Sequence, residues 1–215
     1  MPQSLSRSSI RGAAAATLLD TIAGRADSRG WQVAERAGAV AFVTVLTAIA
    51  AQISIPLPFT PVPFTFQPMV VLVGGAALGA RLGMSSQILY LALGIAGLPV
   101  FAASPALPPG LARLAGPTGG YLMSYPIAAL VAGLLAERGF DRRYLTAFLA
   151  MAAGLAIVFA CGVAWLGVVA RPAQGISGAL AAGFYPFVAA DLLKLLAAAG
   201  VMPGLWWLAG SRGSA

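Results

Sequence analysis

The sequence predicts an all-α membrane protein, a six-transmembrane-helix bundle with both termini in the cytoplasm. Of its 215 residues, 60% are hydrophobic and only 9% are charged, and the mean hydropathy is +0.89. Soluble domains carry about 25% charged residues, so this chain cannot cover a surface that faces water. Its apolar runs are long and lack strict alternation, which favours helices over the strands of a β-barrel.

The chain divides into a polar tail and six apolar segments. Residues 1–36 contain five arginines, and we expect them to form a cytoplasmic N-terminal tail. Residues 37–210 are expected to form one six-helix transmembrane domain. Its apolar segments lie near residues 37–55, 66–80, 82–101, 117–136, 144–170 and 179–209. The second segment is short for a full span, which needs about 20 residues.

The distribution of arginines predicts the orientation. With six spans and the N-terminus inside, ten arginines fall on the cytoplasmic side and two, Arg113 and Arg171, fall on the outer side. This asymmetry follows the rule that cytoplasmic loops carry an excess of basic residues. Because the net charge of +7 comes from arginines at the ends of apolar runs, it indicates membrane topology and not nucleic-acid binding.

Several kinds of chemistry are excluded by composition. The chain has no histidine, which removes His-ligated zinc, a Ser-His protease dyad and the usual proton shuttle. Its one cysteine, Cys161, cannot form an internal disulfide or a Cys-based metal motif. We therefore expect no metal, no cofactor and no enzymatic activity.

A proline-rich loop, residues 54–68, separates the first two spans. Its five prolines remove backbone donors and prevent a continuous helix. Yet it is apolar, with Phe59, Phe64 and Phe66, whereas a solvated linker would be polar. Two interpretations fit equally well: a lid or re-entrant segment over a cavity, or a loop that is packed on neighbouring helices.

The fourth span opens with a glycine turn, Gly116-Pro-Thr-Gly-Gly-Tyr121. Gly119 and Gly120 allow close approach of the backbone, and free N–H groups near a helix start can receive an anion. Thr118, Tyr121 and Ser124 add hydroxyl groups. A ligand contact and a simple packing turn are both compatible with this pattern. The turn is not a P-loop, because no Gly-Lys-Ser/Thr follows, so we expect no ATP hydrolysis by this chain.

A charged pair, Asp191 and Lys194, lies inside the last span. Each intramembrane charge costs about 2.5–3.5 kcal/mol on insertion scales, and at i and i+3 the two side chains share one helix face. Aspartate accepts hydrogen bonds from ligand N–H groups, and lysine donates to a carbonyl or carboxylate. The pair favours a site for a small polar solute over an internal salt bridge or a proton relay. Gln67 and Tyr90 are further polar groups expected in the interior, while Arg113 is interpreted as a solvated loop residue that could attract an anion.

The first span carries a face of small residues, including Ala37, Ala41 and Ala48. Small residues at this spacing let helices approach closely in lipid. The sequence alone favours packing within the bundle, and docking of another membrane protein is the alternative.

Three stretches, taken together, resemble the BioY family. They are Gln52-Ile-Ser-Ile-Pro-Leu-Pro with Val62-Pro-Phe-Thr-Phe-Gln67, then Gly116-Pro-Thr-Gly-Gly-Tyr121, then Pro186-Phe-Val-Ala-Ala-Asp191-Leu-Leu-Lys194. Tyr90 and Gly97-Leu-Pro-Val-Phe101 add to the likeness. BioY proteins are the biotin-specific substrate-capture subunits of energy-coupling-factor (ECF) transporters. One difference is that the family more often has Pro-Gly where this chain has two alanines before Asp191.

The resemblance implies a protein of the bacterial plasma membrane that binds biotin at the extracytoplasmic side and mediates its uptake. The proline-rich loop would close over biotin. The pocket would be lined by Asp191, Lys194, Gly119, Gly120, Tyr121, Thr118, Gln67, Tyr90 and Ser124. The face of Ala37, Ala41 and Ala48 would dock a transmembrane coupling subunit that works with ATPase subunits, within membrane lipid. Open alternatives are a capture subunit for another vitamin or small metabolite, an intramembrane enzyme, and a structural subunit whose ion pair sets helix register.

Overall fold

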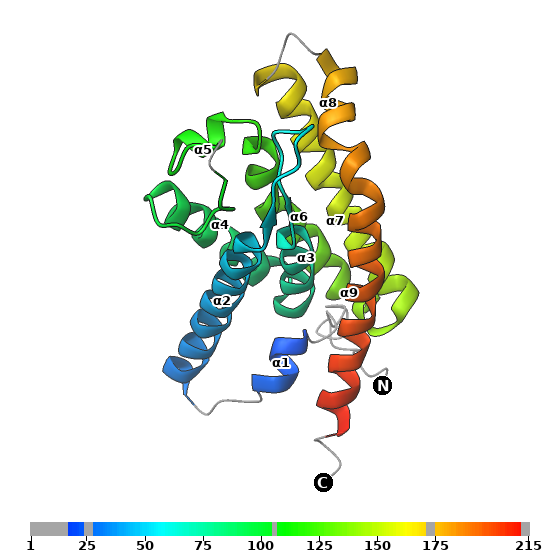
Figure 1. Cartoon of the computed structure of the whole chain (residues 1–215). Coiled ribbons are helices and arrows are strands. Elements are labelled where there is room, and N and C mark those ends of the chain that lie inside the picture. The colour runs from blue at the N-terminus through cyan, green and yellow to red at the C-terminus, as the bar shows by residue number, and fades with distance from the viewer. Residues whose placement is uncertain (1–16, 24–27, 105–106, 171–174, 212–215) are drawn as a thin grey trace, which may run out of the picture.

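The computed structural model describes residues 17–23, 28–104, 107–170 and 175–211, and most of this chain is helical (Figure 1). The short helix α1 (Leu18–Ala23) precedes the long helix α2 (Arg29–Gln52), which begins inside the range predicted as the tail. A small antiparallel hairpin follows, formed by β1 (Ser54–Ile55) and β2 (Phe64–Thr65). The remaining helices are α3 (Gln67–Leu78), α4 (Ala80–Ile95), α5 (Ala112–Ala115), α6 (Gly119–Ala136), α7 (Tyr144–Trp165), α8 (Gly175–Gly183) and α9 (Tyr185–Ser211).

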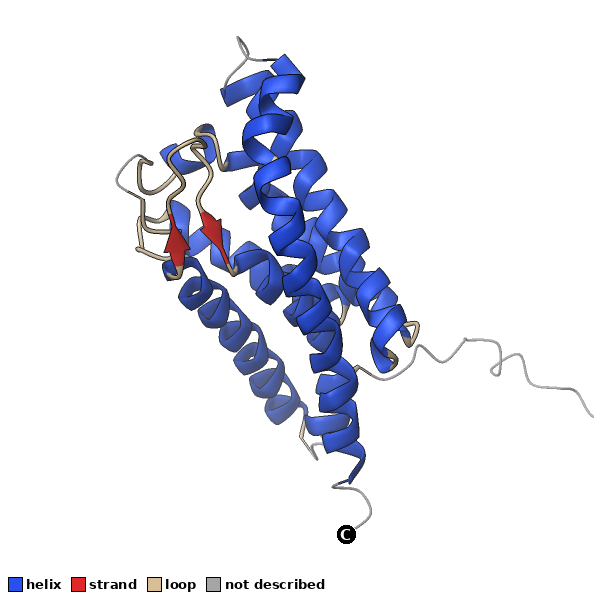
Figure 2. Ribbon diagram, turned by 45° about the vertical axis from the view of Figure 1, so that its right-hand side comes forward, coloured by secondary structure: helices blue, strands red, loops and turns tan. Residues whose placement is uncertain are grey.

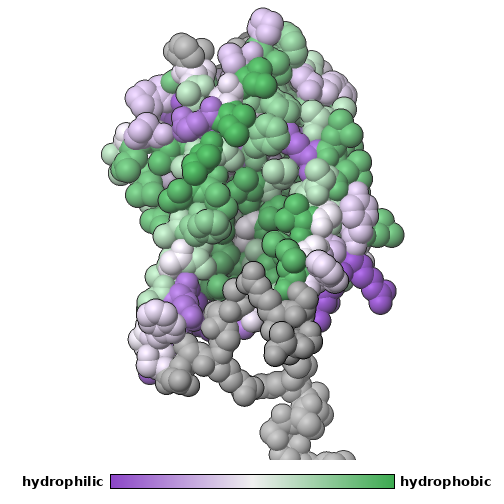
Figure 3. All heavy atoms as spheres, turned by 60° about the horizontal axis from the view of Figure 1, so that its bottom comes forward, coloured by the Kyte–Doolittle hydropathy of each residue, from purple (hydrophilic) through white to green (hydrophobic). Residues whose placement is uncertain are grey.

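Within the described residues, four helical segments are long and apolar enough to cross a membrane. They are α2, α6, α7 with its π-helical extension to Val169, and α9 as far as Ala209. The helix α3, at 12 residues, is apolar but shorter, in agreement with the short second segment of the sequence. Figure 3 shows hydrophobic residues across the middle of one face, with hydrophilic residues gathered above and below. The chain is therefore a largely helical membrane protein.

The apolar segment near residues 179–209, which the sequence predicts as one span, is divided at Phe184 into α8 and α9. Pro186 has no N–H, so the carbonyl of Ala182 lacks its usual helical partner. The Thr60 hydroxyl of the proline-rich loop donates to that carbonyl at 2.5 Å. The Tyr121 hydroxyl donates to the next carbonyl, that of Gly183, at 2.8 Å. These two hydrogen bonds therefore tie the loop and α6 to the end of α8, just before α9 begins.

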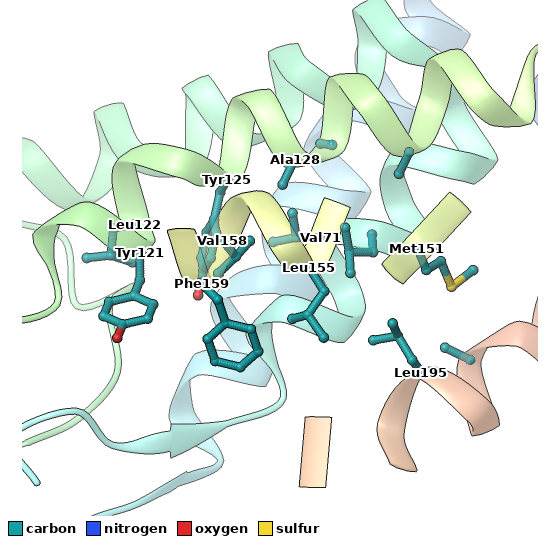
Figure 4. Close-up of a cluster of buried hydrophobic side chains, with 14 of the residues drawn as sticks. Val71, Tyr121, Leu122, Tyr125, Ala128, Met151, Leu155, Val158, Phe159 and Leu195 are labelled. Atoms are coloured by element: carbon teal, nitrogen blue, oxygen red, sulfur yellow. The ribbon is translucent and has the colours of Figure 1, made fainter. Parts of the chain in front are cut away.

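The core of the bundle is built around α6, which contacts α3, α4 and α7. Ala128, Ala129 and Ala132 on α6 are fully buried, and such small side chains let neighbouring helices approach closely. Figure 4 shows larger side chains of α6 meeting those of α7, with Tyr125 close to Val158. Tyr125 and Val158 also line a cavity beside the proline-rich loop, so the packing of this core holds part of the cavity wall in place.

Gly75 on α3 marks one of the closest helix contacts, because an added Cβ would lie 2.5 Å from the carbonyl oxygen of Ala129 on α6. Backbone cannot swing aside as a flexible side chain can. Gly75→Ala is therefore expected to push α3 from α6 and to destabilise the fold by about 1–3 kcal/mol, measured as a lower melting temperature in detergent. Gly204→Ala on α9 is the control, since nothing lies within 4 Å of its added Cβ. Equal melting temperatures for the two variants would contradict this contact.

The C-terminal part of α9 is held to the loop between α6 and α7 by Asp141. This residue lies in a 3₁₀ turn (Phe140–Arg142) and is only 1% exposed. The indole Nε1 of Trp206 donates to Asp141 Oδ2 at 2.6 Å, and the guanidinium of Arg142 lies 4.6 Å from the centre of the Trp206 ring. Burial raises the pKa of the Asp141 carboxyl above its usual value, against the opposing effect of the Trp206 hydrogen bond.

This raised pKa predicts a pH-dependent difference between the wild type and Asp141→Asn. A carboxyl with a raised pKa binds its proton more tightly in the folded state, so its contribution to stability falls as pH rises through the window between the usual and the raised value. Asparagine cannot ionise, yet its amide oxygen can still accept from Trp206. The variant should melt at or above the wild-type temperature at neutral pH, and the gap should shrink on acidification. A gap that stays constant across the pH range would contradict the prediction.

Candidate ligand-binding site

A cavity of about 60 Å³ lies between the proline-rich loop and the ends of the surrounding helices. Figure 2 shows the two strands of the loop on one side of the molecule, next to the end of a long helix. The lining combines apolar and aromatic walls with a few polar groups from α3, α5, α6 and α9. The lining residues are Val62, Pro63, Thr65, Gln67, Pro68, Phe101, Ala102, Arg113, Thr118, Tyr121, Leu122, Tyr125, Val158, Phe159, Phe187, Asp191 and Lys194.

The charged pair of α9 faces this cavity. Lys194 Nζ lies 2.7 Å from Asp191 Oδ1, and the two residues are 8% and 6% exposed, respectively. The second oxygen of Asp191 accepts no hydrogen bond from the described part of the chain, which leaves an acceptor for a ligand. Helical spacing of i and i+3 explains the contact, and Phe187, one turn earlier, extends the same face as an apolar wall.

The proline-rich loop lines the cavity and accepts a hydrogen bond from the lysine of the charged pair. Ser54 pairs with Thr65 across the hairpin, and the carbonyl oxygen of Thr65 accepts a hydrogen bond from Lys194 Nζ at 2.6 Å. The same ammonium lies 3.5 Å from the centre of the Phe64 ring, a cation–π contact. Val62 and Pro63 line the cavity beside them. The loop is therefore packed against Lys194 and forms one wall of the cavity.

Only some of the residues that the sequence analysis assigned to the pocket from the glycine turn and the start of α6 line the cavity. Thr118 and Tyr121 line the cavity. Gly119 and Gly120 do not, because they permit close packing: an added Cβ would clash with the Leu114 carbonyl at the first and with Trp165 of α7 at the second. Ser124 donates to the carbonyl of Tyr121 at 2.6 Å and, with Gly120, lines a separate apolar groove between α6 and α7.

Gln67 and Tyr90 form one polar unit at the edge of the cavity. Gln67 lines the cavity, and its amide nitrogen donates to the Tyr90 hydroxyl at 2.6 Å. Tyr90 is fully buried and donates in turn to the carbonyl of Val100 at 3.0 Å. Its ring meets the Phe101 ring edge-on, with centroids 5.5 Å apart. Tyr90 thus supports the cavity wall from behind.

The sequence interpretation favoured a solvated Arg113, with attraction of an anionic ligand as the alternative, whereas the structure buries this residue. It is only 5% exposed and lines the cavity. One guanidinium nitrogen donates to the carbonyl of Ala102 at 2.9 Å, while Nε has no partner in the described structure and no described carboxylate pairs with the group. Burial lowers the pKa of this guanidinium, and the nearby Tyr90 hydroxyl opposes the shift. A buried cation without a counter-ion favours an anionic ligand.

These groups suit a small molecule with both polar and apolar parts. The cavity offers a carboxylate acceptor and an ammonium donor on α9, and a guanidinium on α5. Between them lie apolar walls that include Phe159 and Leu122. Ligand pockets are typically about 300–1,000 Å³, so a ligand of that class needs the loop or the side chains to move before it fits.

Comparisons with known proteins agree with this architecture. The family model of the "BioY family" matches residues 23–211. The chain is 42% identical over 156 residues to the biotin transporter BioY of Thermotoga maritima, covering 73% of this chain and 86% of that protein. It is 39% identical over 161 residues to the probable biotin transporter BioY of Pyrococcus horikoshii, covering 75% and 90%.

A solved structure shares the fold. The S-component for biotin from an ECF-type ABC transporter aligns with a TM-score of 0.73 and 24% identity, covering 84% of this chain and 94% of that one. The chain belongs to the BioY family, which confirms the resemblance found in the sequence motifs.

Proposed function

We propose that this chain captures biotin at the extracytoplasmic side of the bacterial plasma membrane and mediates its uptake together with an ECF energising module. The observation that carries the proposal is the buried Asp191–Lys194 pair that lines a cavity beneath the proline-rich loop, in a chain whose curated relatives are named biotin transporters. A second cation, Arg113, also lines the cavity. Arg113 is far from Asp191 and Lys194 in the sequence, and the fold brings the three residues together.

Biotin supplies groups that complement each of these side chains. Its ureido ring has two N–H donors and one carbonyl, its second ring is an apolar thioether, and its tail ends in a carboxylate. In the proposed arrangement Asp191 accepts from a ureido N–H, Lys194 donates to a ligand oxygen, and Arg113 pairs with the tail carboxylate. Tyr121 and Thr118 stand beside the rings, with Gln67 and Tyr90 at the edge. Hydrogen bonds to charged groups contribute about 1.5–3 kcal/mol each, which is enough to account for much of the specificity.

The proposed topology has six spans and places both termini in the cytoplasm. The spans are α2, α3, α4, α6, α7 and α9, with the proline-rich loop and α5 on the outer side. Arginines at the opposite end, including Arg81, Arg138 and Arg143, support this orientation. Residues 1–36, which include the first turns of α2, then lie on the cytoplasmic side, and residues 37–210 form the binding domain.

The energising partners are a transmembrane coupling subunit and ATPase subunits, since this chain has no P-loop. Ala37 and Ala41 on α2 are exposed and available to such a subunit, whereas Ala48 is half-buried and packs against the core. The docking surface proposed here is therefore the half of the small-residue face that precedes Phe42.

Equilibrium binding to the purified, detergent-solubilised chain tests the proposal. Labelled biotin should bind saturably at one site, and unlabelled biotin should displace it better than any other vitamin in a competition panel. Absence of saturable biotin binding, or stronger displacement by another vitamin, would refute the assignment. Mass spectrometry of any small molecule that copurifies with the chain gives an independent check.

A further inference from the structure

A buried polar seam joins α2 to α4, away from the ligand cavity. It consists of Thr44 and Thr47 on α2 and of Ser86 and Gln87 on α4, all at most 2% exposed. The Gln87 amide nitrogen donates to Ser86 Oγ at 3.0 Å and to Thr47 Oγ1 at 3.3 Å. The Thr44 hydroxyl lies 2.9 Å from the Ser86 carbonyl oxygen and 2.9 Å from the Val40 carbonyl oxygen of its own helix, so its one proton is shared between these two acceptors. Two hydrogen bonds therefore cross between the helices at the depth of the membrane.

The seam carries a cost that packing alone does not explain. The amide oxygen of Gln87 is buried and has no partner in the described structure. An unpaired buried acceptor destabilises a fold, so an apolar side chain of similar size would serve stability as well or better. None of the four residues lines the ligand cavity. Neither the stability of the core nor the proposed contacts with biotin therefore explains why these four polar residues are present.

The seam lies where α2 changes from exposed to buried. No residue of α2 from Arg29 to Phe42 is buried, and the buried residues of this helix begin at Val43. Figure 1 shows this first half of α2 lying apart from the other long helices. The exposed Ala37 and Ala41 are on this half, and Thr44 follows them on the same helix face, i+3 from Ala41. The anchored half of α2 therefore controls where the projecting half points.

We propose that Gln87 and Thr44 are positioning residues, whose cross-helix hydrogen bonds set the direction of the projecting half of α2 and so present its small-residue face to the coupling subunit. The second part rests on the proposed function, while the first part concerns this chain alone. In lipid, no hydrophobic force holds one helix to another, so interhelical hydrogen bonds and close packing decide the orientation of a weakly packed helix.

The first experiment measures the direction of α2 directly. Spin labels at Ala37→Cys and at Leu145→Cys, an exposed residue at the start of α7, are introduced in a Cys161→Ser background. The double variant Thr44→Val/Gln87→Met removes both cross-helix bonds at nearly constant volume and should broaden or shift the distribution of label distances. The control Ser85→Ala/Thr146→Val removes two exposed hydroxyls that bond only to their own helix or its N-cap, and should leave it unchanged.

The second experiment separates positioning from general stability. In the native sequence background, Thr44→Val/Gln87→Met should keep its melting temperature and its affinity for biotin, yet lower uptake with the energising subunits by about fivefold or more. A distance distribution identical to that of the wild type would overturn the proposal, as would loss of uptake in parallel with stability or affinity. A chain that shows the altered distribution but binds no biotin would refute the proposed function and leave the positioning role intact.

Discussion

Asp191→Ala and Lys194→Ala are each expected to weaken biotin binding at least about tenfold, while the protein still inserts into the membrane. A hydrogen bond to a charged group contributes about 1.5–3 kcal/mol, and tenfold corresponds to 1.4 kcal/mol. Each single variant also leaves its former partner buried and unpaired, which costs stability. Removing both charges should therefore restore part of the melting temperature that the single variants lose, without restoring binding.

Leu193→Ala is the matched control for this pair. Leu193 lies between the two charged residues on the same helix but is 67% exposed and points away from the cavity. Its replacement should leave affinity unchanged. Unchanged biotin affinity in both Asp191→Ala and Lys194→Ala would defeat the site assignment, even if their melting temperatures fell.

The helices and the charged pair could be predicted because their signals are local. Hydropathy over a window of residues locates the apolar segments, and the spacing of Asp191 and Lys194 places both side chains on one face whatever else the chain does. The division at Phe184 was less visible. Pro186 signals a helix start, but only the fold shows that Thr60 satisfies the carbonyl that the proline leaves free.

For the glycine turn and α6, the sequence predicts which residues share a helix face but not which face lines the cavity. Leu122 and Tyr125 on α6 share a face with Thr118, the N-cap of this helix, by helical spacing, and this face lines the cavity. Gly120 and Ser124 lie on the adjacent face, which packs beside α7. Sequence spacing gives the two faces but not which of them meets the ligand, because that depends on where α7 packs.

The burial of Arg113 is set entirely by contacts between residues that are distant in the sequence. Its sequence context, an outer loop before a glycine turn, is equally compatible with a solvated side chain. In the folded chain, α5 places Arg113 beside Ala102 in the lining of the cavity, and its guanidinium donates a hydrogen bond to the Ala102 carbonyl. Its burial, and the absence of a described carboxylate beside it, could not be read from neighbouring residues.

Arg113→Met is expected to weaken the binding of biotin by about tenfold or more, and the binding of biotin methyl ester far less. The ester has the same rings and tail but lacks the negative charge that the guanidinium would meet. The wild type should therefore prefer the acid, and the variant should bind the two ligands about equally. Titration of biotin and its methyl ester against the wild type and Arg113→Met measures the coupling energy between the guanidinium and the ligand carboxylate. The four affinities are combined as in a double-mutant cycle.

The comparison between ligands separates charge recognition from support of the wall. If Arg113 acted only by holding the Ala102 carbonyl, Arg113→Met would weaken the acid and the ester by the same factor, and the proposed pairing with the carboxylate would be wrong. Arg113→Lys refines the test, because lysine keeps the charge but loses the planar fork that pairs with a carboxylate through two nitrogens. It should retain part of the preference for the acid. A preference that survives unchanged in Arg113→Met would place the carboxylate elsewhere in the cavity, with Lys194 as the remaining cation in its lining.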